Sequence, residues 1–159
     1  MASIFNEDFK EYINLLNKHE VEYMLVGGMA VNLYGYRRAT GDMDLFVNPT
    51  ESNHEKLKRV HFEFGMLMGE MEELENFLSN SEFDVFTFGV SPVQIDIMTA
   101  CKGLRFAEAY PKSKRVPFEN IIINLISNSD LLKAKEASNR KRDQADIEEL
   151  NKIERKKKD

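Results

Sequence analysis

The sequence predicts one domain of the mixed α/β (α+β) class, in which a small mixed sheet is flanked by helices. Short apolar runs bounded by glycine, proline or polar residues are typical of strands, and they occur at 22–26, 40–47 and 93–98. Segments with apolar residues at helical spacing stand between these runs. The 159 residues, 42% of them hydrophobic, suffice for one core. We therefore expect a single domain over residues 1–159, with a helical C-terminal part at about 127–155.

The first predicted elements are a helix, a strand and a second, shorter helix. The opening helix is amphipathic, with apolar side chains at Ile4, Phe5, Phe9, Tyr12, Ile13 and Leu16. The run 22–26 then predicts a strand, followed by a tight turn at Gly27 and Gly28 and a short helix over 29–34. Glycines let a backbone approach a ligand closely, and a helix that starts at such a turn suits a phosphate. Glycine pairs also occur in ordinary turns, so this pair alone identifies no site.

The predicted strand at 40–47 carries two aspartates on one face. Side chains alternate along a strand, so Asp42 and Asp44 point the same way, while Met43 and Leu45 face the opposite side. Adjacent ionised carboxylates repel each other unless a hard divalent cation lies between them, which predicts a metal site. The alternative is that the two acids only mark the end of a loop and the start of an edge strand.

A third carboxylate, Asp96, lies at the centre of the apolar strand predicted at 93–98. A lone charge in such a strand is costly unless it is paired or bound to a metal. The segment 83–88 should form a hairpin with this strand and bring Asp96 beside Asp42 and Asp44. Three carboxylates on adjacent strands can hold two Mg²⁺ ions, which clamp phosphates and activate an attacking hydroxyl.

The remaining elements around the hairpin are predicted from caps and spacing. Thr50 is the expected N-cap of a helix that reaches Phe64, and 104–110 and 116–123 predict a short helix and a further strand. A second helix is expected within 65–80, where apolar residues recur at Met66, Met68, Met71, Leu74, Phe77 and Leu78. Methionines at this spacing usually fill a core, although they also line adaptable binding surfaces.

The C-terminal part is predicted to be helical and basic. Residues 127–130 resemble a capping box before the helix that carries Lys135, although a lysine in such a helix is commonly solvated. A last helix is expected from about 142, with a frayed tail at 155–158.

The net charge of −5 is unevenly spread along the chain. Residues 1–100 carry 7 basic and 17 acidic side chains, whereas residues 101–159 carry 15 and 10. The negative part argues against a broad duplex-binding surface, because phosphate contacts dominate such affinity. The basic part can guide a nucleotide or an RNA end, or it is simply a solvated helix face.

Nothing in the sequence predicts export or membrane insertion. The N-terminal residues lack the basic start and apolar stretch of a signal peptide, and no apolar run approaches the roughly 20 residues of a membrane helix. The single cysteine, Cys101, excludes an internal disulfide and fits a reducing compartment. We therefore expect a cytoplasmic protein without membrane contact.

The spacing of the glycines and acids resembles the signature of the nucleotidyltransferase superfamily related to DNA polymerase beta. The residues that carry the resemblance are Gly27, Gly28, Gly35, Arg38, Thr40, Asp42, Asp44 and Asp96. More narrowly, the chain is similar to small stand-alone bacterial nucleotidyltransferases, near the abortive-infection toxin and minimal nucleotidyltransferases. The segment LLKAKEASNRKRDQADIEEL, residues 131–150, is similar to that group's helical segment with a lysine, an arginine and two spaced aspartates. The likeness covers most of residues 20–150.

The resemblance implies the nucleotidyltransferase fold and a role for each matching residue. Asp42, Asp44 and Asp96 would be the catalytic carboxylates and the ligands of Mg²⁺ or Mn²⁺, with Asp96 also helping to activate the acceptor hydroxyl. The residues that would contact or shape the site of the donor NTP are Gly27, Gly28, Arg38, Thr40 and Lys135.

Later positions of the family match Arg140, Asp143 and Asp146. Two residues depart from the family pattern: Asn139 stands where a glycine often follows the helix, and Gly28 stands where many members have serine. Neither departure removes a carboxylate.

The function implied is transfer of a nucleoside monophosphate from an NTP to a hydroxyl acceptor, which is an RNA end such as that of tRNA, a protein or a small molecule. The implied context is a toxin–antitoxin or resistance system, in which a helical toxin or antitoxin partner, a homodimer mate or the Met-rich segment 65–80 completes the acceptor pocket. The alternative is a catalytically inactive protein of this fold that binds a nucleotide or a partner.

Overall fold

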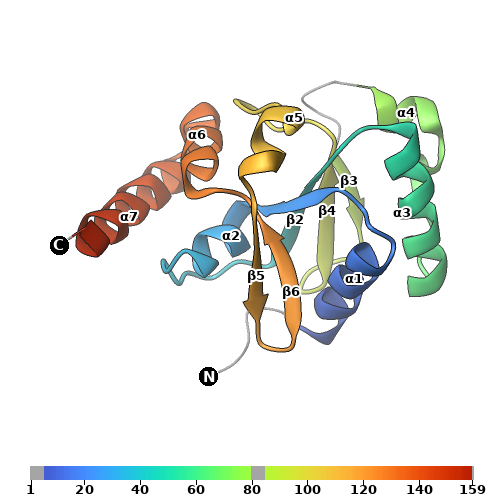
Figure 1. The fold of residues 1–159 in the computed structure, drawn as a ribbon, viewed down its shortest axis with the longest axis horizontal. Coiled ribbons are helices and arrows are strands. Elements are labelled where there is room, and N and C mark those ends of the chain that lie inside the picture. The colour runs from blue at the N-terminus through green and yellow to red at the C-terminus, as the bar shows by residue number, and fades with distance from the viewer. Residues whose placement is uncertain (1–5, 80–84, 159) are drawn as a thin grey trace.

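The computed structural model describes residues 6–79 and 85–158, whose strands form one open mixed sheet (Figure 1). The sheet has the order β3-β4-β2-β1-β6-β5, with β1 Tyr23–Val26, β2 Asp42–Val47, β3 Val85–Phe88, β4 Gln94–Met98, β5 Lys114–Phe118 and β6 Ile121–Leu125. The helices are α1 Glu7–Lys18, α2 Gly27–Leu33, α3 Glu51–Phe64, α4 Leu74–Leu78, α5 Phe106–Ala109, α6 Asn128–Ser138 and α7 Lys141–Lys158. The 3₁₀ helices are η1 Gly69–Glu72 and η2 Tyr110–Lys112. The predicted mixed α/β class is confirmed.

Strand β2 lies inside the sheet, between an antiparallel and a parallel neighbour. It pairs antiparallel with β1 and parallel with β4, and the register places Asp44 opposite Val26 on one side and Asp96 on the other. Strands β3 and β4 form the predicted antiparallel hairpin. Strands β5 and β6 form a second hairpin, which joins β1 through the parallel β6. The two aspartates of β2 are therefore not on an edge strand.

The core and the aspartates lie on opposite faces of β2. Met43, Leu45 and Val47 are fully buried, whereas Asp42 and Asp44 keep partial exposure, as the alternation predicts. In Figure 1, helices α3 and α4 lie to the right of the sheet and α6 and α7 to the left. The C-terminal helices therefore stand apart from the α3 side of the core.

The predicted N-caps of two helices and the predicted buried face of the first helix are confirmed. The Thr50 hydroxyl accepts a hydrogen bond from the Asn53 N–H at 3.1 Å and begins α3. The Ser127 hydroxyl accepts one from the Asp130 N–H at 3.2 Å and begins α6. The buried face of α1 is formed by the predicted residues Phe9, Tyr12, Ile13 and Leu16. The predicted core residues Ile4 and Phe5 lie outside the described residues, as does Phe83 of the predicted hairpin.

The single helix predicted within 65–80 is wrong. Gly65 ends α3 with a φ of +82°, and Gly69 has a φ of +56°, so the chain leaves the right-handed helical region twice within five residues. Two short helices, η1 and α4, replace the predicted helix. Met71 and Phe77 are fully buried, which confirms a core role for part of this segment, but Leu67 is 89% exposed.

Three smaller differences concern element boundaries. Helix α2 begins at Gly27, two residues before the predicted start, because Gly27 itself makes the turn with a φ of +70°. The segment 116–123, predicted to contain one strand, contains parts of two, β5 and β6, since the chain turns at Glu119, whose φ is +54°. The predicted frayed tail at 155–158 continues α7 as helix.

None of the described helices is both long and apolar enough to cross a membrane.

Candidate active site

The three predicted carboxylates come together on one face of two parallel strands. Asp42 and Asp44 lie two residues apart on β2, and Asp96 pairs in register with Asp44 from β4. All three keep partial exposure, whereas Met43 and Ile95, which alternate with them, are buried. The sheet therefore concentrates negative charge at one place on its polar face.

The Asp96 carboxylate is held by two neighbours that the sequence analysis did not identify. The Thr87 hydroxyl donates to Oδ1 at 2.9 Å, and the Gln94 amide donates to Oδ1 and Oδ2 at 3.1 and 3.3 Å. Gln94 lies two residues before Asp96, and this spacing in the sequence predicts that the two side chains share one face of the strand. Thr87 becomes a neighbour only through the β3–β4 register, which the sequence does not fix.

Asp44 is the carboxylate that the site perturbs most clearly. Burial raises the pKa of the Asp44 carboxyl from 3.8 to about 7, and repulsion from Asp96 and Asp42 adds to this rise, while Lys135 opposes it. A buried carboxylate beside two others is destabilised in its charged form until a cation compensates it. A cation bound beside Asp44 would therefore relieve this cost.

The donor set fits a hard divalent cation, although the described residues form no complete ligand group in advance. Among the described residues, no three His, Cys, Asp or Glu side chains are arranged around a common metal position. Mg²⁺ usually binds through one or two carboxylates and completes its shell with water and substrate phosphates. Asp42 and Asp44 meet this requirement, while the Asp96 oxygens already accept hydrogen bonds from Thr87 and Gln94.

The glycine pair lets the backbone approach the side chains of the site itself. A Cβ on Gly27 would overlap the Asp44 carboxylate, with its Cγ only 2.9 Å away. A Cβ on Gly28 would lie 2.5 Å from the Thr40 hydroxyl and 3.3 Å from Arg38 Nη1. No side chain caps α2, which starts here. The glycines were predicted to let the backbone approach a ligand, and in the structure they also make room for Asp44 and Thr40.

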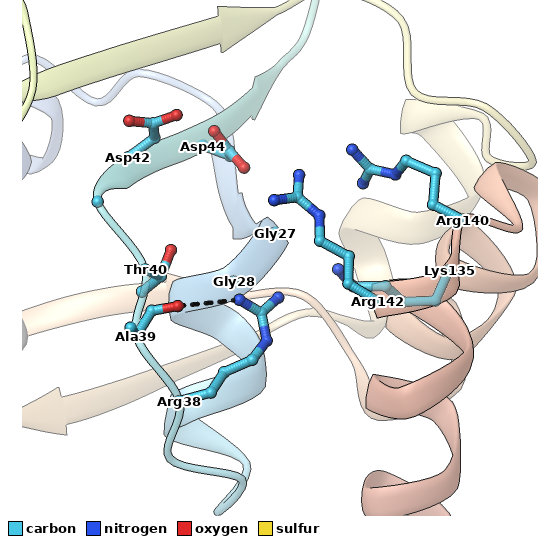
Figure 2. A pocket seen from close by; sticks show the side chains of 11 residues that line it. Gly27, Gly28, Arg38, Ala39, Thr40, Asp42, Asp44, Lys135, Arg140 and Arg142 are labelled. Atoms are coloured by element: carbon cyan, nitrogen blue, oxygen red, sulfur yellow. Dashed lines mark hydrogen bonds between the residues drawn. The ribbon is translucent and has the colours of Figure 1, made fainter.

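A cavity of about 450 Å³, the first cavity, opens beside these residues. Its lining residues are Gly27, Gly28, Arg38, Ala39, Thr40, Gly41, Asp42, Asp44, Lys135, Arg140 and Arg142. Figure 2 shows the Asp42 and Asp44 carboxylates on one side and Lys135, Arg140 and Arg142 on the other. Every predicted site residue except Asp96 lines it. Arg142, which was not predicted, has no sequence signal that separates it from a solvated helix residue.

Four cations around this cavity form what we call the cation wall, namely Arg38, Lys135, Arg140 and Arg142. Arg38 reaches Asp146 through Nε at 2.7 Å and Nη2 at 2.8 Å. Lys135 is only 6% exposed and lies 3.2 Å from Asp143 and 3.0 Å from Asp146. The alternative of a solvated Lys135 is therefore wrong.

A second cavity of about 460 Å³ shares Gly27, Asp44, Lys135 and Arg140 with the first. Its other walls are mostly apolar and are formed by residues such as Val26, Met98, Leu131 and Ala134, together with Cys101. Burial raises the pKa of the Cys101 thiol to about 11, so the thiol stays protonated at neutral pH. The described part of segment 65–80 contributes to neither cavity.

No protein-family model matches this chain, and neither does any curated protein sequence.

Replacing Asp44 by asparagine should stabilise the metal-free protein above neutral pH. The Asp44 carboxyl ionises near pH 3.8 when unperturbed but near pH 7 in the fold, so the folded state loses stability as the pH rises between these values. We expect Asp44→Asn to raise the free energy of unfolding by about 2 kcal/mol at pH ~8 and by far less at pH ~4. Urea denaturation in the presence of EDTA measures both values.

The matched control for this experiment is Glu148→Gln, because Glu148 lies on the exposed side of α7 with a side chain that is 69% exposed. Its stability should follow that of the wild type at both pH values. A wild type as stable as Asp44→Asn at pH ~8 would contradict the assigned burial and repulsion at Asp44.

Gly28→Ala should destabilise the protein, whereas Gly41→Ala should not. The new Cβ at residue 28 meets Thr40 and Arg38, but at residue 41 the nearest atom is Ser91 Oγ at an ordinary 3.6 Å. We expect a loss of about 1–3 kcal/mol for Gly28→Ala and a change within about 0.5 kcal/mol for Gly41→Ala. Both glycines line the first cavity, so equal effects in urea denaturation would show that the Thr40 contact is not the cause.

Proposed function

We propose that the chain has the nucleotidyltransferase fold and is a metal-dependent nucleotidyltransferase. In the proposed reaction, the acceptor oxygen forms a bond to the α-phosphorus of an NTP, the bond from that phosphorus to pyrophosphate breaks, and the acceptor proton leaves. The observation that carries the proposal is the first cavity, where the β2 carboxylates face the cation wall. A polyphosphate with its metal needs both kinds of charge at adjacent positions.

The cation wall is the part that would bind the triphosphate. Three of its members are arginines, whose planar guanidinium groups offer paired N–H donors to phosphate oxygens. The fourth, Lys135, is fixed beside Asp143 and Asp146 at the junction of both cavities. Phosphates held here would place the α-phosphorus toward Asp42 and Asp44.

Asp42 and Asp44, with Asp96 as the third carboxylate, would hold Mg²⁺ or Mn²⁺, which neutralises phosphate charge and lowers the pKa of the acceptor hydroxyl. Asp96 would accept the acceptor proton, since a general base needs a fixed orientation and a reachable oxygen. Thr87 and Gln94 supply that orientation.

The second cavity offers room for the nucleoside of the NTP. It adjoins the cation wall through Lys135 and Arg140 and presents apolar side chains that suit the face of a base. The acceptor is a hydroxyl of an RNA end, a protein or a small molecule, and the described residues form no further domain that would select among these. We propose a toxin–antitoxin or resistance context, in the cytoplasm, for this activity.

A nucleotide-binding protein without transfer activity is the second candidate, and one observation favours it. The Asp96 oxygens already accept hydrogen bonds from Thr87 and Gln94, and Asp96 does not line the first cavity. A protein that only holds a nucleotide needs the cation wall but not a complete metal site. The two candidates differ in whether label is transferred.

Wild-type protein should transfer label from an α-³²P-labelled NTP to an acceptor in host lysate or bulk tRNA when Mg²⁺ or Mn²⁺ is present. Asp44→Asn should reduce this transfer by about 100-fold or more, because it removes a charged metal ligand while the fold remains. Gel and thin-layer separation of the products measures transfer and identifies the acceptor class. EDTA should abolish it.

Wild-type rates in Asp44→Asn, or transfer that persists in EDTA, would refute the metal-dependent assignment. Metal-dependent NTP binding without transfer to any acceptor would favour the second candidate.

Filling the apolar part of the second cavity should weaken NTP binding much more than it weakens phosphate binding. Ala134→Phe places a ring among the apolar side chains of this cavity, away from Arg38 and Thr40. We expect NTP affinity to fall about tenfold or more, as for a blocked apolar pocket. Affinity for inorganic tripolyphosphate, measured by calorimetry in the same buffer, should fall much less, because Arg38 and Arg142 do not line the second cavity. An unchanged NTP affinity would place the nucleoside elsewhere.

A further inference from the structure

Two carboxylates that do not line the first cavity are completely buried beneath the cation wall. Asp143 and Asp146 lie three residues apart in the first turns of α7, and both are 0% exposed. Residues at this spacing occupy the same face of a helix. A buried charge is costly unless it is paired and hydrogen bonded, so two of them side by side require an explanation.

The partners of both carboxylates are cations of the cation wall. Asp146 binds Arg38 through two parallel hydrogen bonds and lies 3.0 Å from Lys135. Asp143 accepts from Arg140 Nε at 2.8 Å and Nη2 at 3.2 Å, and from Lys135 at 3.2 Å. Burial raises the pKa of both carboxyls, but the hydrogen bonds from these cations outweigh it and hold each pKa below its ordinary value.

Each cation keeps N–H donors that the ion pairs do not use. The Lys135 ammonium has three donors, of which two point to Asp143 and Asp146. A guanidinium has five donors, and Arg38 uses two for Asp146 and one for the Ala39 carbonyl oxygen at 3.2 Å. Arg140 uses two side-chain donors for Asp143. The ion pairs therefore fix three side chains of the first cavity and leave donors on each of them for a ligand.

These pairs also join distant parts of the chain. Arg38 precedes β2 and Asp146 lies on α7, 108 residues later. Lys135 comes from α6, and Arg140 from the connection between α6 and α7. Without the two carboxylates, like charges from three segments would face one another across a partly buried site, and their long side chains would separate into solvent.

We propose that Asp143 and Asp146 are positioning residues that hold Arg38, Lys135 and Arg140 in one arrangement, so that their remaining donors converge on a polyphosphate. This inference rests on the proposed function only in taking the first cavity as the phosphate site. It predicts a change in anion affinity opposite to the change that charge alone would cause. If the two carboxylates only added negative charge near the cavity, their neutralisation would tighten anion binding. If they position the cations, their neutralisation weakens it.

The test is the affinity for inorganic tripolyphosphate in excess Mg²⁺, measured by calorimetry. Asp146→Asn and Asp143→Asn should each weaken binding about tenfold, because each removes charge-assisted hydrogen bonds that orient the cations contacting the tripolyphosphate. The matched control is Glu148→Gln, which removes the same charge from the exposed side of α7 and should leave the affinity unchanged. Unchanged or tighter binding by both aspartate variants would overturn the proposal.

A double substitution separates positioning from general loss of structure. Arg38→Ala should weaken tripolyphosphate binding in the wild type but should add little in the Asp146→Asn background, because Arg38 is then no longer held in place. Equal effects in both backgrounds would show that Asp146 does not act through Arg38. If thermal unfolding shows that Asp146→Asn does not fold, Asp143→Asn determines whether affinity rises or falls. This variant should fold, because the side chain of its partner Arg140 is 56% exposed and can be solvated.

The outcomes for this proposal and for the proposed function are distinguishable. A wild type that does not bind tripolyphosphate overturns the positioning role. A wild type that binds it, with the expected loss in the aspartate variants but no label transfer, overturns only the proposed catalysis.

Discussion

The register between β2 and β4 is the constraint on which the rest of the site depends. It sets Asp44 beside Asp96 on the polar face and at the same time places Met43 and Leu45 in the core. A slip by one residue would exchange these faces, burying two charges and exposing the apolar side chains. The apolar residues therefore enforce the position of the carboxylates, although the carboxylates themselves repel one another. Packing on one face of the strand stabilises an electrostatically unfavourable arrangement on the other.

The opposite wall of the cavity is organised in a different way. No single strand or helix carries the cation wall, since Arg38 comes from the segment before β2, Lys135 from α6 and Arg140 from the connection between α6 and α7. Their common feature is contact with Asp143 or Asp146, which are buried on one face of α7. Hydrogen bonds to Asp143 and Asp146 thus fix the positions of these cations, just as strand alternation fixes the positions of the Asp42 and Asp44 carboxylates. The C-terminal helices contribute to the site through these ion pairs.

The difference between the two walls explains what the sequence could predict. Strand alternation and apolar flanks are local, so the face shared by Asp42 and Asp44, the hairpin that brings in Asp96 and the Ser127 cap were all readable. The ion pairs of Arg38 and Lys135 were not, because a buried lysine and a solvated one occupy similar helix positions until long-range partners are known. The helix predicted over 65–80 was wrong for a related reason. The prediction relied on six apolar residues at helical spacing, but two glycines in this segment have positive φ values that interrupt the helix.

The arrangement of paired and unpaired charge argues for a ligand that carries both signs. Lys135 and Arg38 line the same cavity as the β2 carboxylates, yet their charge-assisted hydrogen bonds go to Asp143 and Asp146, and Asp44 keeps a pKa raised to about 7. The cation wall therefore does not neutralise the carboxylates of β2. A metal cation alone would satisfy only the carboxylates, and a polyphosphate alone would satisfy only the cations. A metal–polyphosphate complex satisfies both at once, because it carries a cation for the carboxylates and anionic oxygens for the cation wall.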